Sequence, residues 1–356
     1  MTIPYHEDEA TRIFVGDAHD VLSGMPDASV DCVVTSPPYW GLRDYGHPDQ
    51  YGAEDSPEDY IHTLCTTFDQ VHRVLADDGT LWINIGDRYA ANSDGCRRGQ
   101  GFHDRQPFTR PASDLAPKNL LGLPWRLAFA LQTHDWVLRN AVIWHKPNAM
   151  PESVTDRLSC RYEHIFLFVK QRRYHFDLDP IRRPYTDDRT LPRRSRTGGT
   201  RRNSITTTWP PIGGTRGTQG CTGPSARRRS GTDGKYADAD PAFRGKAHGT
   251  QMQPTGTRHA AAHPNGRNPG DVWTIPTRPY RQAHFAVFPI DIPLRAIAAG
   301  CREGGTVLDP FAGAGTTLLA AHQLDRHAVG IDVNPAYAEL ALTRLRRAHG
   351  AKGGKR

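Results

Sequence analysis

Two short segments, far apart in the chain, carry residue types that can do chemistry. The first is Ser36-Pro37-Pro38-Tyr39, which follows the apolar run 30–35. Two consecutive prolines cannot continue a sheet ladder, and they fix an extended turn. The turn presents a hydroxyl and an aromatic ring at the carboxyl end of a predicted strand, where open α/β sheets bind ligands. An ordinary loop with a packed tyrosine has the same composition.

The second segment is Val-Leu-Asp-Pro-Phe-Ala-Gly-Ala-Gly-Thr-Thr, residues 307–317. Its glycines, Gly313 and Gly315, allow a ligand to approach the backbone closely, and the helix predicted to follow offers free N–H groups. Asp332 lies 19 positions after Gly313 (332 − 313). This is the spacing at which a Rossmann-type site holds ribose hydroxyls with a carboxylate. The third glycine of a dinucleotide site is replaced by Leu318, which counts against NAD or FAD.

Strand and helix patterns alternate around both segments. Ser56-Pro57 predicts a helix start and Asp78-Gly79 its end, with Ile61, Leu64, Phe68, Val71 and Leu75 on one apolar face. Further helices are predicted over 123–132, 290–299, 316–324 and from 335 onward. Strands are predicted over 11–15, 30–35, 80–85, 136–145, 164–170, 306–308 and 328–331. This alternation indicates an α/β fold with a mostly parallel sheet covered by helices on both faces.

Charge is concentrated in one segment. Residues 186–270 hold fifteen Lys or Arg and five Asp or Glu, a net of +10, so the rest of the 356-residue chain carries 7 − 10 = −3. The segment also has fourteen Gly and eight Pro, and it cannot bury enough apolar surface to offset its ordering entropy. We expect it to be largely disordered when free and to meet a polyanion, although a solvated loop without a partner has the same composition.

Other classes of protein are disfavoured. No run approaches the roughly 18 apolar residues that span a bilayer, and the first ten residues do not form a secretory signal. The six cysteines form no C-x-x-C pair, which argues against a zinc site or a disulfide framework and indicates a reducing cytoplasm. We therefore predict a cytoplasmic protein with no membrane partner and no metal.

The two motifs together resemble the amino-methylating DNA methyltransferases, the N4-cytosine and N6-adenine family. Residues 35–40 are similar to the family's catalytic loop and 309–316 to its cofactor loop. Other similar segments are 16–17, 80–87, 141–148, 161–170 and 284–289. The resemblance covers the chain except 186–270 and a glycine-bearing basic loop near 91–118. The catalytic loop precedes the cofactor loop, as in the permuted group called beta, whose target-recognition region lies between the two.

The resemblance implies a Rossmann-like, circularly permuted methyltransferase fold that binds S-adenosylmethionine. Residues 1–185 and 271–356 would form one catalytic domain, with 186–270 as the target-recognition insert. The implied cofactor-binding residues are Asp17, Phe288, Asp309, Pro310, Phe311, Gly313, Gly315, Thr316, Thr317 and Asp332. The implied catalytic residues are Ser36, Pro37, Pro38 and Tyr39.

The implied reaction is methyl transfer to the exocyclic amine of a base flipped out of double-stranded DNA. The Ser36 side chain and the Pro37 carbonyl would accept the amino hydrogens, Pro38 would shape the turn, and Tyr39 would stack on the base. Serine rather than aspartate at position 36 favours cytosine N4 over adenine N6. A protein-glutamine methyltransferase, which uses Asn-Pro-Pro-Tyr, and a non-catalytic DNA-binding protein with this fold are the alternatives.

The basic insert supplies the candidate DNA contacts. Arginines there can neutralise phosphates without reading sequence. They are Arg193, Arg194, Arg196, Arg201, Arg202, Arg227, Arg228 and Arg229. A cognate restriction endonuclease is a possible partner of such an enzyme. Two other basic groups, Arg97-Arg98 and the cluster of Arg344, Arg346 and Arg347, are expected to be solvated.

Overall fold

The computed structural model describes residues 3–42, 47–90, 114–185, 263–278 and 287–353. The chain forms one compact unit, made of 1–184 and 265–356, and a second unit over 185–264. All but Tyr185, His263 and Pro264 of the second unit lie outside the described residues, as do the eight arginines proposed above for DNA contact. Residues 265–270, which the sequence assigned to the insert, belong to the first unit, where Arg267 exchanges backbone hydrogen bonds with Arg183.

Within the described residues, nine strands form one sheet in the order β1-β2-β9-β8-β3-β4-β6-β5-β7. The strands are β1 (His6–Glu7), β2 (Thr11–Val15), β3 (Val30–Thr35), β4 (Leu75–Ile85), β5 (Val137–His145), β6 (Tyr162–Val169), β7 (Val272–Thr274), β8 (Thr306–Asp309) and β9 (His327–Asp332). The five adjacent strands from β2 to β4 run parallel, whereas β6 is antiparallel to both β4 and β5. The predicted α/β class with a mostly parallel sheet is confirmed.

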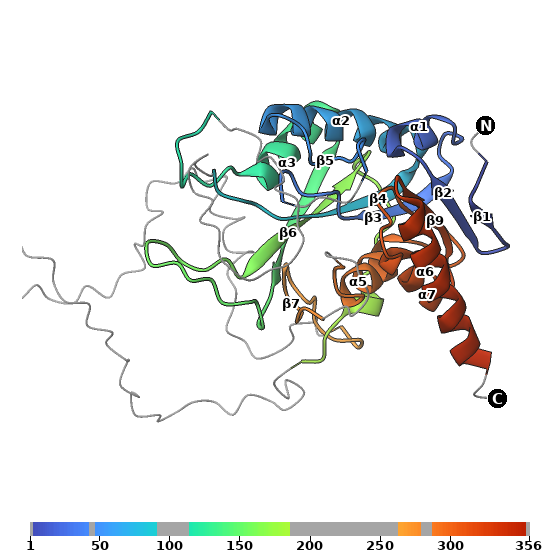
Figure 1. Cartoon of the computed structure of the whole chain (residues 1–356). Helices are drawn as coiled ribbons and strands as arrows, with labels where there is room; N and C mark the ends of the chain where they lie inside the picture. The colour runs from blue at the N-terminus through green and yellow to red at the C-terminus, as the bar shows by residue number, and fades with distance from the viewer. Residues whose placement is uncertain (1–2, 43–46, 91–113, 186–262, 279–286, 354–356) are drawn as a thin grey trace, which may run out of the picture. The chain divides into compact units, whose positions relative to one another are not determined.

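Helices cover both faces of this sheet (Figure 1). They are α1 (Ala18–Ser23), α2 (Pro57–Val74), α3 (Leu123–Thr133), α5 (Asp291–Gly300), α6 (Thr316–Gln323) and α7 (Pro335–Gly353), with a short 3-10 turn, η1 (Asp179–Ile181). Successive side chains of β3 point to opposite faces of the sheet, so the core has two parts. Val33 packs with residues of α1, α2 and α3 on one face, whereas Cys32 and Val34 pack with residues of α5, α6 and α7 on the other. None of these helices is long and apolar enough to cross a membrane.

Helix α2 begins as the sequence predicts and ends earlier. The Ser56 hydroxyl accepts a hydrogen bond from the Asp59 backbone N–H at 3.0 Å, and Pro57 occupies the first turn. The predicted stop at Asp78-Gly79 is wrong, because Leu75 is already extended and pairs with Val30 in the sheet. The chain therefore passes from α2 into β4 without an intervening loop. Four short elements, β1, α1, η1 and β7, were not predicted.

Strand order places the two motifs next to each other. From β8 the chain crosses through α6 to β9 on one side, and from β3 it crosses through α2 to β4 on the other. The connections thus diverge between β8 and β3, which are paired and parallel. Open α/β sheets bind ligands at the carboxyl ends of the strands that flank such a switch point. Residues 36–39 and 310–313 follow those ends.

Candidate active site

A cavity of about 510 Å³ opens at this edge of the sheet. The five parallel strands from β2 to β4 supply Gly16, Asp332, Asp309, Ser36 and Asn84 at or near their carboxyl ends. The antiparallel β6 begins at the same edge and adds Glu163, and β5 ends there and leads to Lys146. The volume is within the range of about 300–1,000 Å³ that small-molecule sites occupy.

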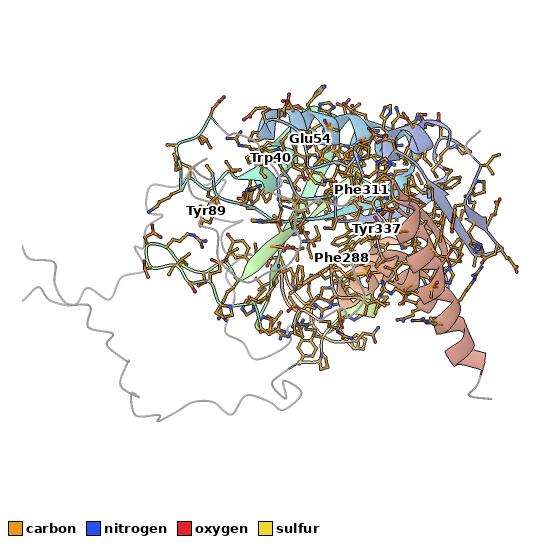
Figure 2. All side chains as sticks on the ribbon, in the orientation of Figure 1. Trp40, Glu54, Tyr89, Phe288, Phe311 and Tyr337 are labelled. Atoms are coloured by element: carbon orange, nitrogen blue, oxygen red, sulfur yellow. The ribbon has the colours of Figure 1, made fainter. Side chains whose placement is uncertain are left out.

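Most of the residues singled out in the sequence line this cavity together. Both loops contribute, although about 270 residues separate them in the chain. Those on the wall are Ser36, Pro37, Pro38, Tyr39, Phe288, Asp309, Pro310, Phe311, Gly313, Thr316 and Asp332. In Figure 2 the labelled Phe288, Phe311 and Tyr337 lie in one region beside the carboxyl edge, and all three border the cavity.

Three expected cofactor residues, Asp17, Gly315 and Thr317, do not line the cavity. The Asp17 carboxylate caps α1 by accepting from the Asp20 N–H, so the wall here consists of its neighbours Gly16 and Ala18. Gly315 packs against α7, where an added Cβ would lie 2.7 Å from that of Ala341. Thr317 is buried beneath the loop and donates to the Val34 carbonyl at 3.1 Å.

Asp332 organises the cofactor-loop side of the cavity. Its two carboxylate oxygens accept hydrogen bonds from the Gly313 N–H at 2.8 Å and the Asn334 N–H at 2.9 Å. Gly313 has φ +48°, a conformation that glycine adopts without strain. Burial raises the pKa of Asp332 to about 6, although these two N–H groups favour the ionised form. Each oxygen keeps a second lone pair for a ligand hydroxyl.

Asp309 joins the cofactor loop to the catalytic loop. It is 2% exposed, and its Oδ1 accepts from the Thr35 hydroxyl at 2.7 Å and from the Phe311 N–H at 3.1 Å. Burial raises its pKa to about 6, with a smaller contribution from the charge of Asp332. Its Oδ1 therefore bonds residues of both loops and ties them together.

The catalytic loop is held by contacts on several sides. The Tyr60 hydroxyl donates to the Pro38 carbonyl at 2.8 Å, and the Arg88 guanidinium donates to the Trp40 carbonyl at 2.9 Å. The Tyr39 ring passes so close to Gly86 that an added Cβ would lie 2.7 Å from ring atom Cε2. The Tyr39 hydroxyl donates to Glu163 Oε2 at 2.7 Å. These contacts fix the ring relative to the sheet.

Several residues on the cavity wall were missed by the sequence reasoning. Asn84, Lys146 and Glu163 lie in segments that resemble the family, but no motif singled them out. Tyr51 stands edge-on to Phe311 at 5.0 Å between ring centroids. The remaining missed residues on the wall include Gln50, Trp144, Thr277, Arg278 and Tyr337. They come from loops, from the end of β5 and from the first turn of α7, and no local motif in the sequence marks them.

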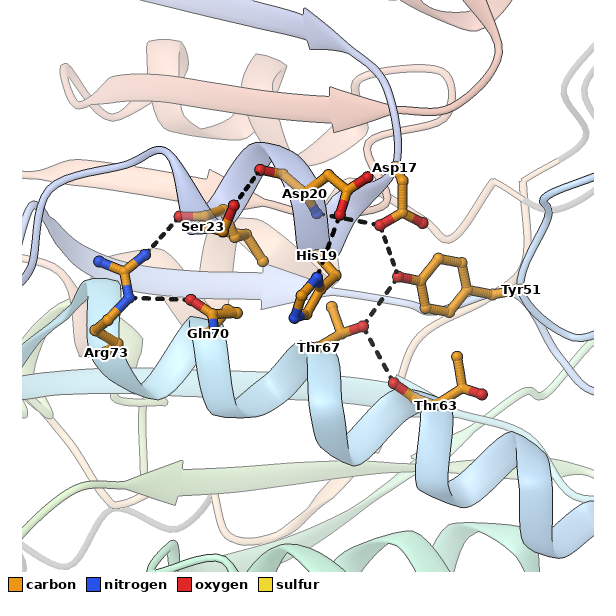
Figure 3. Close-up of polar contacts among 10 residues, drawn as sticks. Asp17, His19, Asp20, Ser23, Tyr51, Thr63, Thr67, Gln70 and Arg73 are labelled. Atoms are coloured by element: carbon orange, nitrogen blue, oxygen red, sulfur yellow. Dashed lines mark hydrogen bonds and ion pairs between the residues drawn. The ribbon is translucent and has the colours of Figure 1, made fainter. Parts of the chain in front are cut away.

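Polar contacts hold the Tyr51 hydroxyl in place (Figure 3). Its hydroxyl lies 3.0 Å from Thr67 Oγ1 on α2 and 3.4 Å from Asp17 Oδ1. Burial raises the pKa of Tyr51 to about 12, so the hydroxyl remains protonated and able to donate. Asp17 thus contacts the cavity through Tyr51. In the described part of the chain, Asp17, His19 and Asp20 are also the one group of three acidic, histidine or cysteine side chains close enough to share an ion.

Arg344 is not the solvated residue expected from the sequence. It is partly buried and donates to the Ala314 carbonyl and, at 3.0 Å, to Thr316 Oγ1. It therefore fastens the glycine loop to α7. Its neighbours Arg346 and Arg347 are exposed, as expected, and Arg97-Arg98 lie outside the described residues. The sequence pattern of α7 could not show that Arg344 contacts a loop that lies 30 residues earlier in the chain.

Comparison with known proteins identifies the family. A family profile described as DNA methylase, of the N6 and N4 type, matches residues 30–343. Type II methyltransferase M.SmaI of Serratia marcescens is 38% identical over 342 residues, covering 94% of this chain and 91% of its own. Type II methyltransferase M.Cfr9I of Citrobacter freundii is 36% identical over 342 residues, covering 95% and 89%.

A solved structure shares the fold. PvuII DNA methyltransferase, described as cytosine-N4-specific, superposes with a TM-score of 0.57 at 15% sequence identity, over 96% of this chain and 88% of that one. The profile match spans more than half of the chain, and the relatives align along nearly their whole length. The chain therefore belongs to the DNA methylase family of N6-adenine and N4-cytosine methyltransferases.

Proposed function

We propose that this protein transfers a methyl group from S-adenosylmethionine to the N4 amine of a cytosine flipped out of double-stranded DNA. The observation that carries the proposal is the shared cavity, in which Ser36 and Pro37 face the same space as Phe311, Gly313 and Asp332. S-adenosylmethionine is the methyl donor of this family. One cavity with both loops on its wall can hold donor and acceptor together, as a direct transfer requires.

The wall of the cavity suits an adenosyl group. Asp332 would accept from the ribose hydroxyls with its remaining lone pairs, and Gly313 leaves room for close approach. Phe288, Phe311 and Tyr337 offer aromatic surface for the adenine. We propose these residues, with Pro310 and Thr316, as the cofactor site; Asp17, Gly315, Thr317 and Asp309 would support it from outside or beneath.

The chemistry of the acceptor assigns roles to the catalytic loop. An exocyclic amine is a weak nucleophile because its lone pair is delocalised into the ring. The Ser36 hydroxyl oxygen and the Pro37 carbonyl would accept its two hydrogens, interactions that strengthen as the nitrogen gains positive charge. Tyr39 would stack on the base, and Pro38 would keep the loop extended. The bound S-adenosylmethionine supplies an electrophilic methyl group to this nitrogen.

Cytosine is favoured over adenine because position 36 is a serine. Family members with aspartate there are mostly adenine enzymes, whereas serine usually accompanies cytosine N4. Ser36 lies on the cavity wall, where this difference would act on the base. Adenine N6 is the second candidate.

The relatives support a site-specific role. They are named Type II methyltransferases, so we propose that this chain is the modification enzyme of a comparable restriction system, acting in the cytoplasm beside a cognate endonuclease. Target recognition is assigned to the insert, whose net charge of +10 suits the DNA backbone. The eight insert arginines would contact phosphates.

The test is incubation with tritiated S-adenosylmethionine and unmethylated genomic DNA, followed by digestion and nucleoside chromatography. Label in N4-methylcytosine is expected. Label in N6-methyladenine would refute the choice of base while keeping the reaction. Absence of label, with cofactor binding demonstrated by calorimetry, would refute DNA methylation and favour a protein substrate or a non-catalytic role. A Ser36→Ala variant, which keeps the loop and removes the hydroxyl, is the matched control.

A further inference from the structure

Glu163 lies at the meeting point of three cavity-lining side chains. It is the second residue of β6 and pairs with Trp144 of β5, so it lies at the same edge of the sheet as the catalytic loop. Its Oε2 accepts from the Tyr39 hydroxyl at 2.7 Å and from the Asn84 amide at 3.0 Å, and its Oε1 forms an ion pair with the Lys146 ammonium. The catalytic loop, β4, β5 and β6 are thereby tied together.

These contacts are partly shielded from water. The side chains of Glu163 and Lys146 are 16% and 18% exposed, so the pair is less screened than a surface ion pair. A carboxylate accepts about four hydrogen bonds and donates none, so Tyr39 must be the donor in its contact. Hydrogen bonds to an ionised acceptor are roughly twice as strong as neutral ones. Glu163 therefore holds the Tyr39 hydroxyl firmly.

A second contact restrains the same ring. Gly86 lies directly against the Tyr39 ring edge, and the hydroxyl is fixed at the far end by Glu163. A ring held at both places cannot swing about its Cα–Cβ bond without breaking a charged hydrogen bond. Stacking on a flipped base needs a ring plane that is already set, because alignment obtained before binding lowers the barrier to reaction.

We infer that Glu163 is a positioning residue that sets the plane of Tyr39 for stacking on the target base. The inference rests on the proposed transfer to a flipped base. Glu163 itself need not touch the base or the cofactor, because its effect passes through the Tyr39 hydroxyl. Lys146 and Asn84 contact the same carboxylate and keep it aimed at that hydroxyl.

A double-mutant cycle tests this inference in the full-length protein. The variants are Glu163→Ala, Tyr39→Phe and their combination, assayed for kcat and for KM of both substrates with plasmid DNA. Glu163→Ala is expected to lower kcat about tenfold or more, the loss corresponding to a hydrogen bond with a charged group. The KM for S-adenosylmethionine is expected to stay within about twofold, because Tyr39 acts on the base.

The combined variant gives the decisive comparison. In the Tyr39→Phe background, Glu163→Ala is expected to cost at least about threefold less than in the wild type, because the hydroxyl that it positions is already absent. Glu163→Gln keeps a carbonyl oxygen for Tyr39 and is expected to recover most of the kcat lost in Glu163→Ala. Losses that multiply in the combined variant would overturn the inference, because Glu163 would then act independently of the Tyr39 hydroxyl.

Two controls separate this outcome from misfolding and from failure of the proposed function. Asp78→Ala removes an ion pair with Arg302 on the opposite edge of the sheet and is expected to leave kcat unchanged. Calorimetric binding of S-adenosylmethionine shows that each variant is folded. The chromatographic identity of the methylated base tests the proposed function independently, since either base can reveal the coupling between Tyr39 and Glu163.

Discussion

Thr35 and Asp309, 274 residues apart in the chain, share a hydrogen bond of 2.7 Å at the point where the sheet connections diverge. Thr35 ends β3 and is followed by the catalytic loop, and Asp309 ends β8 and is followed by the cofactor loop. Both are buried, at 1% and 2% exposure. This contact joins the starts of the two loops. In the proposed reaction it would therefore help to set the separation of methyl donor and acceptor.

Thr35→Val removes the hydroxyl with little change of shape and leaves a buried carboxylate short of a donor. The free energy of unfolding is expected to fall by about 1–3 kcal/mol, and methyl transfer to slow through misalignment of the loops. Denaturant melts and initial rates measure the two effects. Thr63→Val, which removes an exposed helical hydroxyl that bonds its own turn, should change neither. Unchanged stability in Thr35→Val would show that the contact contributes nothing.

Tyr39→Ala is expected to lower turnover on duplex DNA by about tenfold or more, because stacking on a base contributes about 1–3 kcal/mol. Affinity for S-adenosylmethionine should change little, since the tyrosine belongs to the catalytic loop. Single-turnover rates and cofactor calorimetry separate these quantities. Gly86→Ala should reproduce the rate defect, because the new Cβ would displace the ring. Full activity in Tyr39→Ala would rule out the stacking role.

The elements that position the site were largely predictable from local pattern. The Ser-Pro start of α2 and the glycine turn before α6 are signals carried by a few adjacent residues, and both match the structure. The end of α2 was not predictable in the same way. Asp78-Gly79 is a good local stop, but pairing of Leu75 with Val30 on another strand ends the helix first. Tertiary pairing overrides the local signal there.

Site residues were predictable from the sequence where they are adjacent to one another within a motif. The two loops were found because prolines or glycines mark the backbone around them. No such residues mark Glu163, Lys146 or Tyr51. Glu163 and Lys146 reach the site through the register of β6 against β5, and Tyr51 through a loop that folds back onto α2. Asp17 was expected at the cofactor from its position in the sequence. In the structure its carboxylate caps α1 and accepts from the Tyr51 hydroxyl, contacts that the sequence pattern does not show.

Deletion of residues 190–260 tests the assignment of target recognition to the insert. The ends can be joined by a short linker, because Arg183 and Arg267 exchange backbone hydrogen bonds of 2.9 and 2.8 Å beside the cut. Asn265 must be kept, since its amide bonds Asp179. Duplex DNA binding should be lost while S-adenosylmethionine still binds. Retention of site-specific methylation by the shortened protein would place recognition elsewhere.

Cofactor affinity should depend on pH through Asp332. Its raised pKa of about 6 means that the carboxylate loses its charge as the pH falls from 7 to 5, and with it the acceptor proposed for the ribose. Affinity is expected to fall by up to about tenfold per pH unit below that pKa. Calorimetric titrations between pH 5 and 8 measure it.

Stability of the ligand-free protein should change in the opposite direction. A carboxyl with a folded pKa of about 6, above its ordinary value of 3.8, binds more protons when folded between those two pH values. Its contribution to the free energy of unfolding therefore increases as the pH falls through 6. Asp332→Asn removes this contribution, so the difference in the free energy of unfolding between wild type and variant measures it. Cofactor affinity in the variant should be weak and nearly independent of pH. A wild-type affinity that stays constant from pH 8 to 5 would exclude the ionised Asp332 as the ribose acceptor.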